Sequence, residues 1–362
     1  MRYFAEPINP TSSLSLRSRV QNILKQQPGR WFDHPKHLDP IIAGCLSPSV
    51  RSSSRVNMEE HILGRNVVLT WRKILTRIFV GESITLHVSL IDGILYMEEE
   101  DPRPRWRARE YAFGDAVGMA FEGAYTVTSA KSKRKGRDQA KGRIQLEGLT
   151  HIGTQWRNIV VRTLGDLNLV FCGEVDAVRD LKNNTGRETD MDFLNRRIEL
   201  KCRNSKGGNK PRPRWHMQSH LLAVPEIFVG YRNDSDKDGR LEIVRTRLIR
   251  TEDIRPVNFE EQIERGYRVL KELRERLCGS STEGTRSTGL IREANSSNAD
   301  RIWKIAIEKW SLRSVKQLDD AKAQKVKKRR EDPSRPIKRI GIVPKVLVQA
   351  IRVSKRAGRI LV

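Results

Sequence analysis

The chain has 362 residues, of which 37% are hydrophobic and 31% charged, and Lys and Arg outnumber Asp and Glu by 69 to 44, a formal net charge of +25 at pH 7. A chain of this length and composition is globular and can bury a sizeable core in one large or two smaller domains. The excess positive charge favours a polyanionic partner, with nucleic acid as the leading class and an anionic membrane surface as the second.

The sequence disfavours a secreted protein and a membrane-spanning protein. Residues 1–20 lack the apolar core of a signal peptide, and no later segment is long and apolar enough to span a bilayer. The cysteines are Cys45, Cys172, Cys202 and Cys278. Because they are far apart, with no CxxC pair, they argue against a zinc ribbon or a disulfide framework and for a reducing compartment. We therefore expect neither secretion nor membrane insertion.

The composition and the apolar periodicity of the sequence change at about residue 60. Residues 1–60 are rich in Ser, Pro and Arg with weak periodicity, which predicts a loosely ordered leader. After Val67, apolar residues at helical spacing predict a helix that includes Trp71 and Ile78. The next segment, SITLHVSLIDGILYMEEE, predicts two strands around an Asp92-Gly93 turn.

The middle of the chain alternates strand and helix signals. The basic segment 130–143 predicts an exposed loop. NIVVRTL, LNLVFCGEVDAV and RIELKCR predict three strands, HMQSHLLAV predicts a helix stopped by Pro225, and EIFVGYRN and RLEIVRTRLI predict two more strands. Apolar residues from Phe259 to Leu277 mark a long amphipathic helix.

The last part begins with a Ser-, Thr-, Gly- and Asn-rich linker near Gly279, followed by RIWKIAIEKW as a candidate closing strand and a basic tail containing KVKKRR. The prediction is a mixed α/β fold with a two-sheet core and flanking helices. Its domains are a leader at 1–60, a catalytic domain at 61–278, and a linker, closing strand and tail at 279–362.

Acidic residues are placed regularly on two of the predicted strands. In residues 195–204, NRRIELKCRN, polar and apolar residues alternate, so Glu199 and Lys201 should share one face. Upstream, Glu174 and Asp176 in FCGEVDAV should share a face for the same reason. Three neighbouring carboxylates raise each other's pKa unless a cation lies among them. Oxygen ligands favour Mg²⁺ or Mn²⁺ over zinc.

An acid pair followed by Glu-x-Lys is the arrangement used by metal-dependent nucleases of the PD-(D/E)XK type, in which the metal activates water for attack on a phosphate. A solvated strand face with alternating charges explains either motif alone, so the identification depends on further motifs.

Those further motifs resemble the DXO family of RNA decapping exoribonucleases. VGMAFEGA resembles that family's Gly-hydrophobic-x-hydrophobic-Glu motif, although Met119 replaces an aromatic residue. GEVDAV and IELK resemble its Glu-x-Asp and Glu-x-Lys motifs, VVLTWRKILT its Trp-Arg motif, and RWHMQSHLLAVPEIFVGYRN the helix and strand after its catalytic core. The five signals keep the family's order across residues 65–250. The family includes a nuclear fungal branch that associates with the main nuclear 5′-to-3′ exoribonuclease.

The resemblance implies roles for individual residues. The implied metal ligands are Glu122, Glu174, Asp176, Glu199 and the main-chain carbonyl of Leu200. Glu122 is also implied to position the nucleophile, Lys201 and Gln218 to contact the scissile phosphate or the water, and Arg72 to bind phosphate. Apart from the resemblance, the favoured interpretation is the ordinary one: Arg72 and Gln218 as surface residues of helices, and Glu122 as a solvated acid beside the core residue Phe121.

The resemblance implies a hydrolase that uses Mg²⁺ or Mn²⁺ on RNA 5′ ends: it removes pyrophosphate, caps or NAD, and in some members degrades the RNA body. An alternative is a mainly non-catalytic partner that stabilises a larger nuclear exoribonuclease, and a third reading is a DNA nuclease of the wider PD-(D/E)XK group. KVKKRR predicts a nuclear-import signal or an RNA-binding arm, with a solvated tail as the alternative. We expect RNA as partner, no membrane, and a nuclear location.

Overall fold

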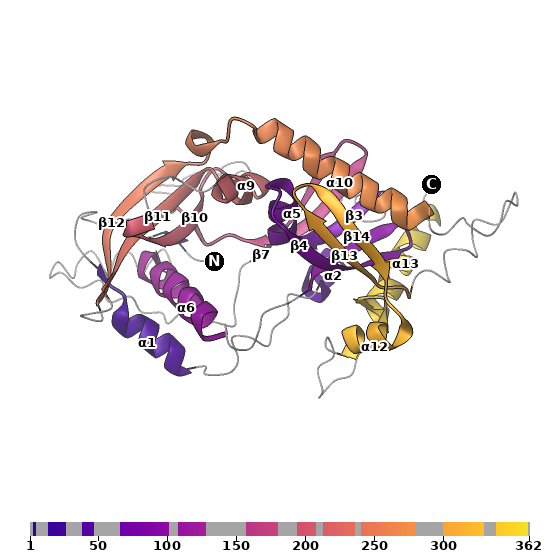
Figure 1. Ribbon diagram of the computed structural model, residues 1–362, viewed down its shortest axis with the longest axis horizontal. Helices are drawn as coiled ribbons and strands as arrows, with labels where there is room; N and C mark the ends of the chain where they lie inside the picture. Colours follow the sequence, from indigo (N-terminus) through magenta and orange to yellow (C-terminus); the bar gives the residue numbers. More distant parts are fainter. Residues whose placement is uncertain are drawn as a thin grey trace, which may run out of the picture. The chain divides into compact units, whose positions relative to one another are not determined.

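The structure is a computed structural model that describes residues 3–4, 14–26, 38–46, 66–100, 108–127, 157–179, 194–207, 213–235, 240–279, 300–328 and 338–360. It confirms a mixed α/β fold with two main sheets and flanking helices (Figure 1). The chain forms two compact units from interleaved segments. The first unit comprises 1–34, 102–158 and 174–257, and the second comprises 35–101, 159–173 and 258–362.

The first unit contains a seven-stranded sheet in the order β2-β12-β11-β10-β9-β1-β6. Its strands are β1 (Tyr3–Phe4), β2 (Leu14–Ser15), β6 (Thr126–Val127), β9 (Ala177–Val178), β10 (Arg197–Asn204), β11 (Glu226–Ser235) and β12 (Arg240–Arg250). β10 and β11 are parallel, whereas β11 and β12 are antiparallel with a register shift between Tyr231 and Arg232. The predicted strands RIELKCR, EIFVGYRN and RLEIVRTRLI are confirmed as β10, β11 and β12.

The faces of this sheet are covered by different helices. α1 (Arg17–Gln26) and α6 (Ala108–Tyr125) lie side by side against it (Figure 1). Phe121 and Tyr125 of α6 pack on Phe228 of β11 in one buried cluster. α9 (Pro213–Leu221) contributes Trp215 to a second cluster that contains Ile227, Val229, Tyr231 and Ile249. Since side chains alternate along β11, its odd and even positions serve opposite faces.

The junctions in this unit are short helical turns. η3 (Ser205–Gly207) follows β10, and η4 (Glu252–Ile254) follows β12. α9 ends before Pro225, as the sequence predicts, because Ala223 adopts a positive φ of 53° and its N–H donates to the carbonyl of His220.

The second unit contains the other seven-stranded sheet, in the order β14-β13-β4-β5-β3-β8-β7. Its strands are β3 (Val67–Trp71), β4 (Ile84–Ile91), β5 (Ile94–Glu99), β7 (Arg157–Leu164), β8 (Leu167–Glu174), β13 (Trp303–Glu308) and β14 (Ser311–Gln317). Its helices are α2 (Asp39–Leu46), α5 (Arg72–Phe79), α10 (Phe259–Gly279), α12 (Asp320–Lys328) and α13 (Lys345–Ile360). β15 (Arg339–Ile340) and β16 (Val343–Pro344) form a separate pair.

Sequence and structure agree on the β4–β5 hairpin and on α10, and they differ at other places in this unit. The helix predicted to include Trp71 begins at Arg72, because residues up to Trp71 form a fully buried strand that pairs in parallel with β5 and β8. The closing strand is a hairpin, β13–β14, and part of the expected basic tail is helical in α12 and α13. The prediction of a loosely ordered leader is wrong for residues 17–26 and 39–46, which form α1 and α2 and bury Val20 and Ile41. The segment 130–143 lies outside the described residues, and the three-part domain division stays a prediction.

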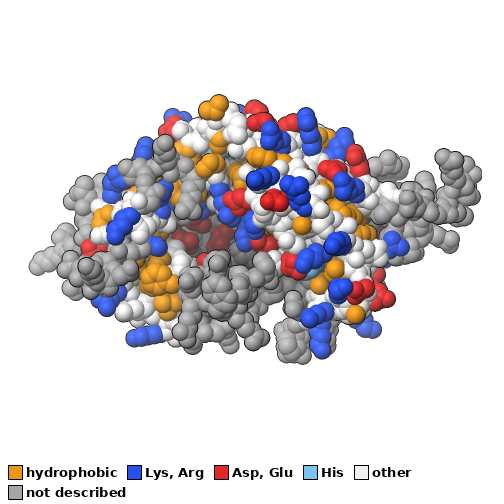
Figure 2. Space-filling model, viewed as in Figure 1, with side chains coloured by type: hydrophobic (Ala, Val, Ile, Leu, Met, Phe, Trp, Pro, Cys, Tyr) orange, Lys and Arg blue, Asp and Glu red, His pale blue; other side chains and the backbone are white. Residues whose placement is uncertain are grey.

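Lys and Arg side chains are spread over the visible face, with acidic side chains among them (Figure 2). Along α10 the two signs meet in exposed pairs one helical turn apart, such as Arg265 with Glu261 and Arg268 with Glu264. Among the helices of the described ranges, none has the length and apolar character needed to cross a membrane.

Candidate metal-binding nuclease site

Strand β10 provides the buried acid of the candidate site. Its apolar residues Ile198 and Leu200 enter the cluster beneath α6, so Glu199 and Lys201 point to the opposite face, as the alternation predicts. Glu199 is only 1% exposed. The Lys201 ammonium donates to the Glu199 carboxylate with an Nζ–Oε1 distance of 2.5 Å, so the buried charge has a cationic partner.

Asp176 reaches the same place from a loop. β8 ends at Glu174 and β9 begins at Ala177, so the prediction that Glu174 and Asp176 share one continuous strand is wrong. Asp176 instead accepts a hydrogen bond of 2.7 Å from the main-chain N–H of Leu200. On the β10 side, β9 pairs with Arg197 and Ile198, and the Asp176 carboxylate then accepts from the N–H of Leu200 farther along β10.

A third acid, Glu122, acts electrostatically on Asp176. The pKa of Asp176 is raised well above its ordinary value, first by burial and then by the negative charges of Glu199 and Glu122. Lys201 and the Leu200 N–H act in the opposite direction without cancelling this effect. Glu122 is half-buried on α6, so strand, loop and helix each contribute one carboxylate.

A hard divalent cation fits this donor set. Buried carboxylates that repel one another are relieved by a cation between them. The donors near Asp176 are oxygens, which suits Mg²⁺ or Mn²⁺ better than a softer metal. The ammonium of Lys201 acts on Asp176 with the opposite sign and lowers its pKa.

For the other predicted site residues, the structure gives the element and the exposure of each. Glu174 is half-buried at the end of β8, two positions before Asp176. Gln218 is half-buried on α9 in the same unit. Arg72 is the first residue of α5, in the second unit. The structure thus groups Glu122, Asp176, Glu199 and Lys201, whereas the roles of Glu174, Gln218, Arg72 and the Leu200 carbonyl stay predictions.

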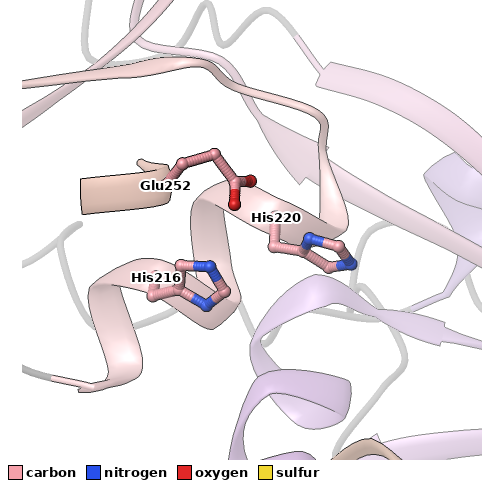
Figure 3. Close-up of side chains that lie close together, drawn as sticks. All are labelled: His216, His220 and Glu252. Carbon is pink, nitrogen blue, oxygen red and sulfur yellow. The ribbon is translucent and has the colours of Figure 1, made fainter. Parts of the chain in front are cut away.

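A second cluster of possible metal ligands was not predicted from the sequence. His216, His220 and Glu252 each offer a ligand atom, and these atoms all lie within 4.8 Å of one another (Figure 3). The spacing of the two histidines, one helical turn apart in WHMQSHLL, was a usable signal. The glutamate was not predictable from spacing, because it comes from η4 beyond two intervening strands.

Comparison with known families gives one match along most of the chain. A family model described as RAI1-like PD-(D/E)XK nuclease matches residues 1–330. Two curated relatives are both named decapping nuclease RAI1. The one from Cryptococcus neoformans is 28% identical over 217 residues, covering 56% of this chain and 52% of the relative. The one from Mycosarcoma maydis is 25% identical over 236 residues, covering 56% and 46%. The matches span about half the length of these relatives.

Solved structures show the same fold. Candida albicans Rai1, in complex with pU5 and Mn²⁺, superposes with a TM-score of 0.61 at 14% identity, covering 98% of this chain and 90% of that one. Schizosaccharomyces pombe Rai1, in complex with 3′-FADP, gives a TM-score of 0.51 at 16% identity, covering 88% and 87%.

Proposed function

The chain belongs to the family of RAI1-like PD-(D/E)XK nucleases, and on that premise we propose that it is a metal-dependent hydrolase of RNA 5′ ends, acting as a pyrophosphohydrolase or decapping enzyme. The observation that carries the proposal is the buried pair Glu199 and Asp176: the negative charge of Glu122 acts on Asp176, and Lys201 forms an ion pair with Glu199. The names of the curated relatives support the same reaction class.

The cation-holding residues in this proposal are Glu122, Glu174, Asp176 and Glu199, with the carbonyl of Leu200. A bound Mg²⁺ or Mn²⁺ supplies charge stabilisation on the phosphate and lowers the pKa of an attacking water. The Candida albicans protein in complex with Mn²⁺ supports a divalent cation of this kind. Titrating activity with each metal in turn would distinguish Mg²⁺ from Mn²⁺.

The protein side chains have separate tasks in this reaction. The Leu200 N–H fixes the orientation of the Asp176 carboxylate through their 2.7 Å hydrogen bond. The Lys201 ammonium, held by Glu199, offsets negative charge on the phosphate oxygens. Gln218 donates to the phosphate or the water, and Arg72 binds phosphate through its planar fork.

Replacing Glu199 with Gln tests the proposal directly. We expect turnover to fall at least 100-fold on 5′-triphosphate, 5′-monophosphate, guanosine-capped and NAD-capped RNA. The reason is that a neutral amide weakens cation binding and leaves Lys201 without its counter-charge. The released products, measured with Mg²⁺, Mn²⁺ or chelator, identify the preferred 5′ end.

The matched control is Glu272→Gln on α10, which removes an equal charge from an exposed pair with Arg276. Such a pair contributes about 1 kcal/mol or less to stability, so this variant should keep wild-type turnover. Full activity of folded Glu199→Gln protein would contradict the assigned site.

We further propose a nuclear location and an association with a larger 5′-to-3′ exoribonuclease. The support is that the family which the sequence resembles includes a nuclear branch with such a partner, and that the chain contains the basic run KVKKRR. Co-purification from a nuclear extract tests the association: a stoichiometric complex that also forms with Glu199→Gln protein is expected, and the absence of any exoribonuclease would contradict it.

A further inference from the structure

We propose that His216, His220 and Glu252 form a second cation site in the first unit, which takes a zinc-class divalent metal rather than Mg²⁺. The geometric basis is that one ligand atom from each side chain lies within 4.8 Å of the other two. Two ligand atoms of a tetrahedral zinc ion, each about 2.1 Å from the metal, lie about 3.4 Å apart. Small side-chain rotations therefore suffice to close the site.

The two histidines are presented together by α9. They are four positions apart and so lie on one face of the helix. Their rings are nearly parallel, with centroids 5.8 Å apart and an interplanar angle of 22°. His216 is fully buried and His220 half-buried, and the Glu252 carboxylate extends over them from a separate element (Figure 3).

The element that carries Glu252 is fixed against the end of α9. The Thr251 N–H donates to the carbonyl of Pro225 at 2.8 Å, and its hydroxyl donates to the carbonyl of Val224 at 2.6 Å. Ile254, at the other end of η4, packs on the cluster that contains Trp215 of α9. These contacts fix the backbone that carries Glu252 next to α9 before any ion binds, which lowers the ordering cost of binding.

The donor types select the metal. Two imidazole nitrogens and one carboxylate favour zinc and its neighbours in the transition series, whereas Mg²⁺ prefers oxygen ligands. Burial lowers the pKa of His216, which favours the neutral ring that a metal requires. The competing cation is Arg255, whose Nη1 is 3.9 Å from Glu252 Oε2 in an exposed pair that contributes little.

This site differs from the acidic site on β10 in both chemistry and position on α9. Gln218 is two residues from each histidine, about 200° around the helix, so it belongs to the opposite face. One helix thus carries a predicted phosphate contact on one side and a nitrogen-rich metal site on the other. A zinc ion there would join α9 to η4.

The test is a zinc titration of the full-length, chelator-treated protein by calorimetry in excess Mg²⁺, which competes for the acidic site of the proposed function. One zinc ion per chain is expected, and both Glu252→Gln and His220→Ala should weaken its binding at least tenfold. Replacing zinc with Co²⁺ should give visible absorption bands of a nitrogen-ligated ion, which the variants lose. Asp253→Asn is the matched control, because it removes a neighbouring exposed charge from η4 and should bind zinc like the wild type.

Glu252 is exposed, so Glu252→Gln should fold normally, as circular dichroism can verify. Zinc binding that is unchanged in both folded variants would overturn the proposal and would indicate other ligands, such as the thiols. Displacement of the zinc by Mg²⁺ would overturn it as well.

Discussion

At the scale of single residues, Asp176 places function in conflict with stability. Its carboxylate is buried beside two other acids, and its raised pKa means that the folded protein disfavours the charged form. We expect Asp176→Asn to stabilise the metal-free protein, because the neutral amide does not carry the buried charge that the folded protein disfavours. The amide oxygen can still accept the Leu200 N–H. Chemical denaturation in chelator measures the change, and a loss of stability would contradict it.

The pH dependence of that difference has a definite sign. Above the raised pKa, the wild type carries the full penalty of the buried charge. As pH falls through that pKa towards the ordinary value, protonation removes the penalty and the wild type gains stability relative to Asp176→Asn. The two proteins should therefore converge in stability at acidic pH. In saturating Mn²⁺ at neutral pH their order should reverse, because the variant loses a ligand.

At the residue scale, the sequence correctly predicted side-chain directions where the local strand geometry alone determines them. Alternation along β10 was enough to predict that Glu199 and Lys201 share a face. It failed for Asp176, because Glu-x-Asp is compatible with a strand, and only the pairing of β9 shows that the chain leaves β8 at Glu174. The partnership of His216 with Glu252 depends on tertiary packing, which spacing in the sequence does not encode.

At the scale of elements, the contact between α6 and β11 determines where Glu122 lies. A Cβ atom at Gly230 would lie 2.2 Å from Cε2 of Phe121, so the ring occupies the space that a larger residue would need. Gly230→Ala should displace Phe121 and the adjacent Glu122. We expect a loss of roughly 1–3 kcal/mol in stability and a decrease in turnover, measured by denaturation and by RNA hydrolysis.

Gly114→Ala is the control for that substitution. It also lies on α6, but a Cβ there meets no atom within 4 Å. In an exposed helical position alanine should stabilise by roughly 0.5–1 kcal/mol. A second test is Gly230→Ala combined with Phe121→Leu, which should recover part of the lost stability because the smaller side chain makes room. If Gly230→Ala alone were neutral in both assays, the packing of α6 would not position Glu122.

Helix and strand boundaries were predictable where an element is amphipathic and unpredictable where it is buried on all sides. α10 has one apolar stripe, and its predicted start at Phe259 is confirmed. β3 is buried at all five positions, so its apolar run merges with that of α5 and the sequence gives no break between them. Parallel partners on both sides of β3, which come from distant segments, fix the boundary at Trp71.

At the scale of the whole molecule, the structure changes the interpretation of the C-terminal region. Its high density of Lys and Arg led to the expectation of a basic tail, because composition alone does not distinguish a solvated cation from one that pairs with a distant acid. Within the described part of this region, Ile342, Val343, Val348 and Ile351 are all buried. Arg352 also donates to Asp92 in the turn between β4 and β5. These residues are part of the second unit.

Arg339 provides the sharpest test of that assignment. Its side chain is 1% exposed, and its guanidinium donates to both carboxylate oxygens of Asp39, at 3.1 and 2.7 Å, and to the carbonyl of Ile342 at 2.8 Å. Arg339→Met leaves Asp39 without this partner and should cost roughly 3 kcal/mol of unfolding free energy. Lys338→Met, an exposed neighbour with the same charge, should change stability by about 0.5 kcal/mol or less. Equal effects of the two substitutions in chemical denaturation would mean that residues from 338 onward add only charge, whereas a large difference makes them part of the folded core.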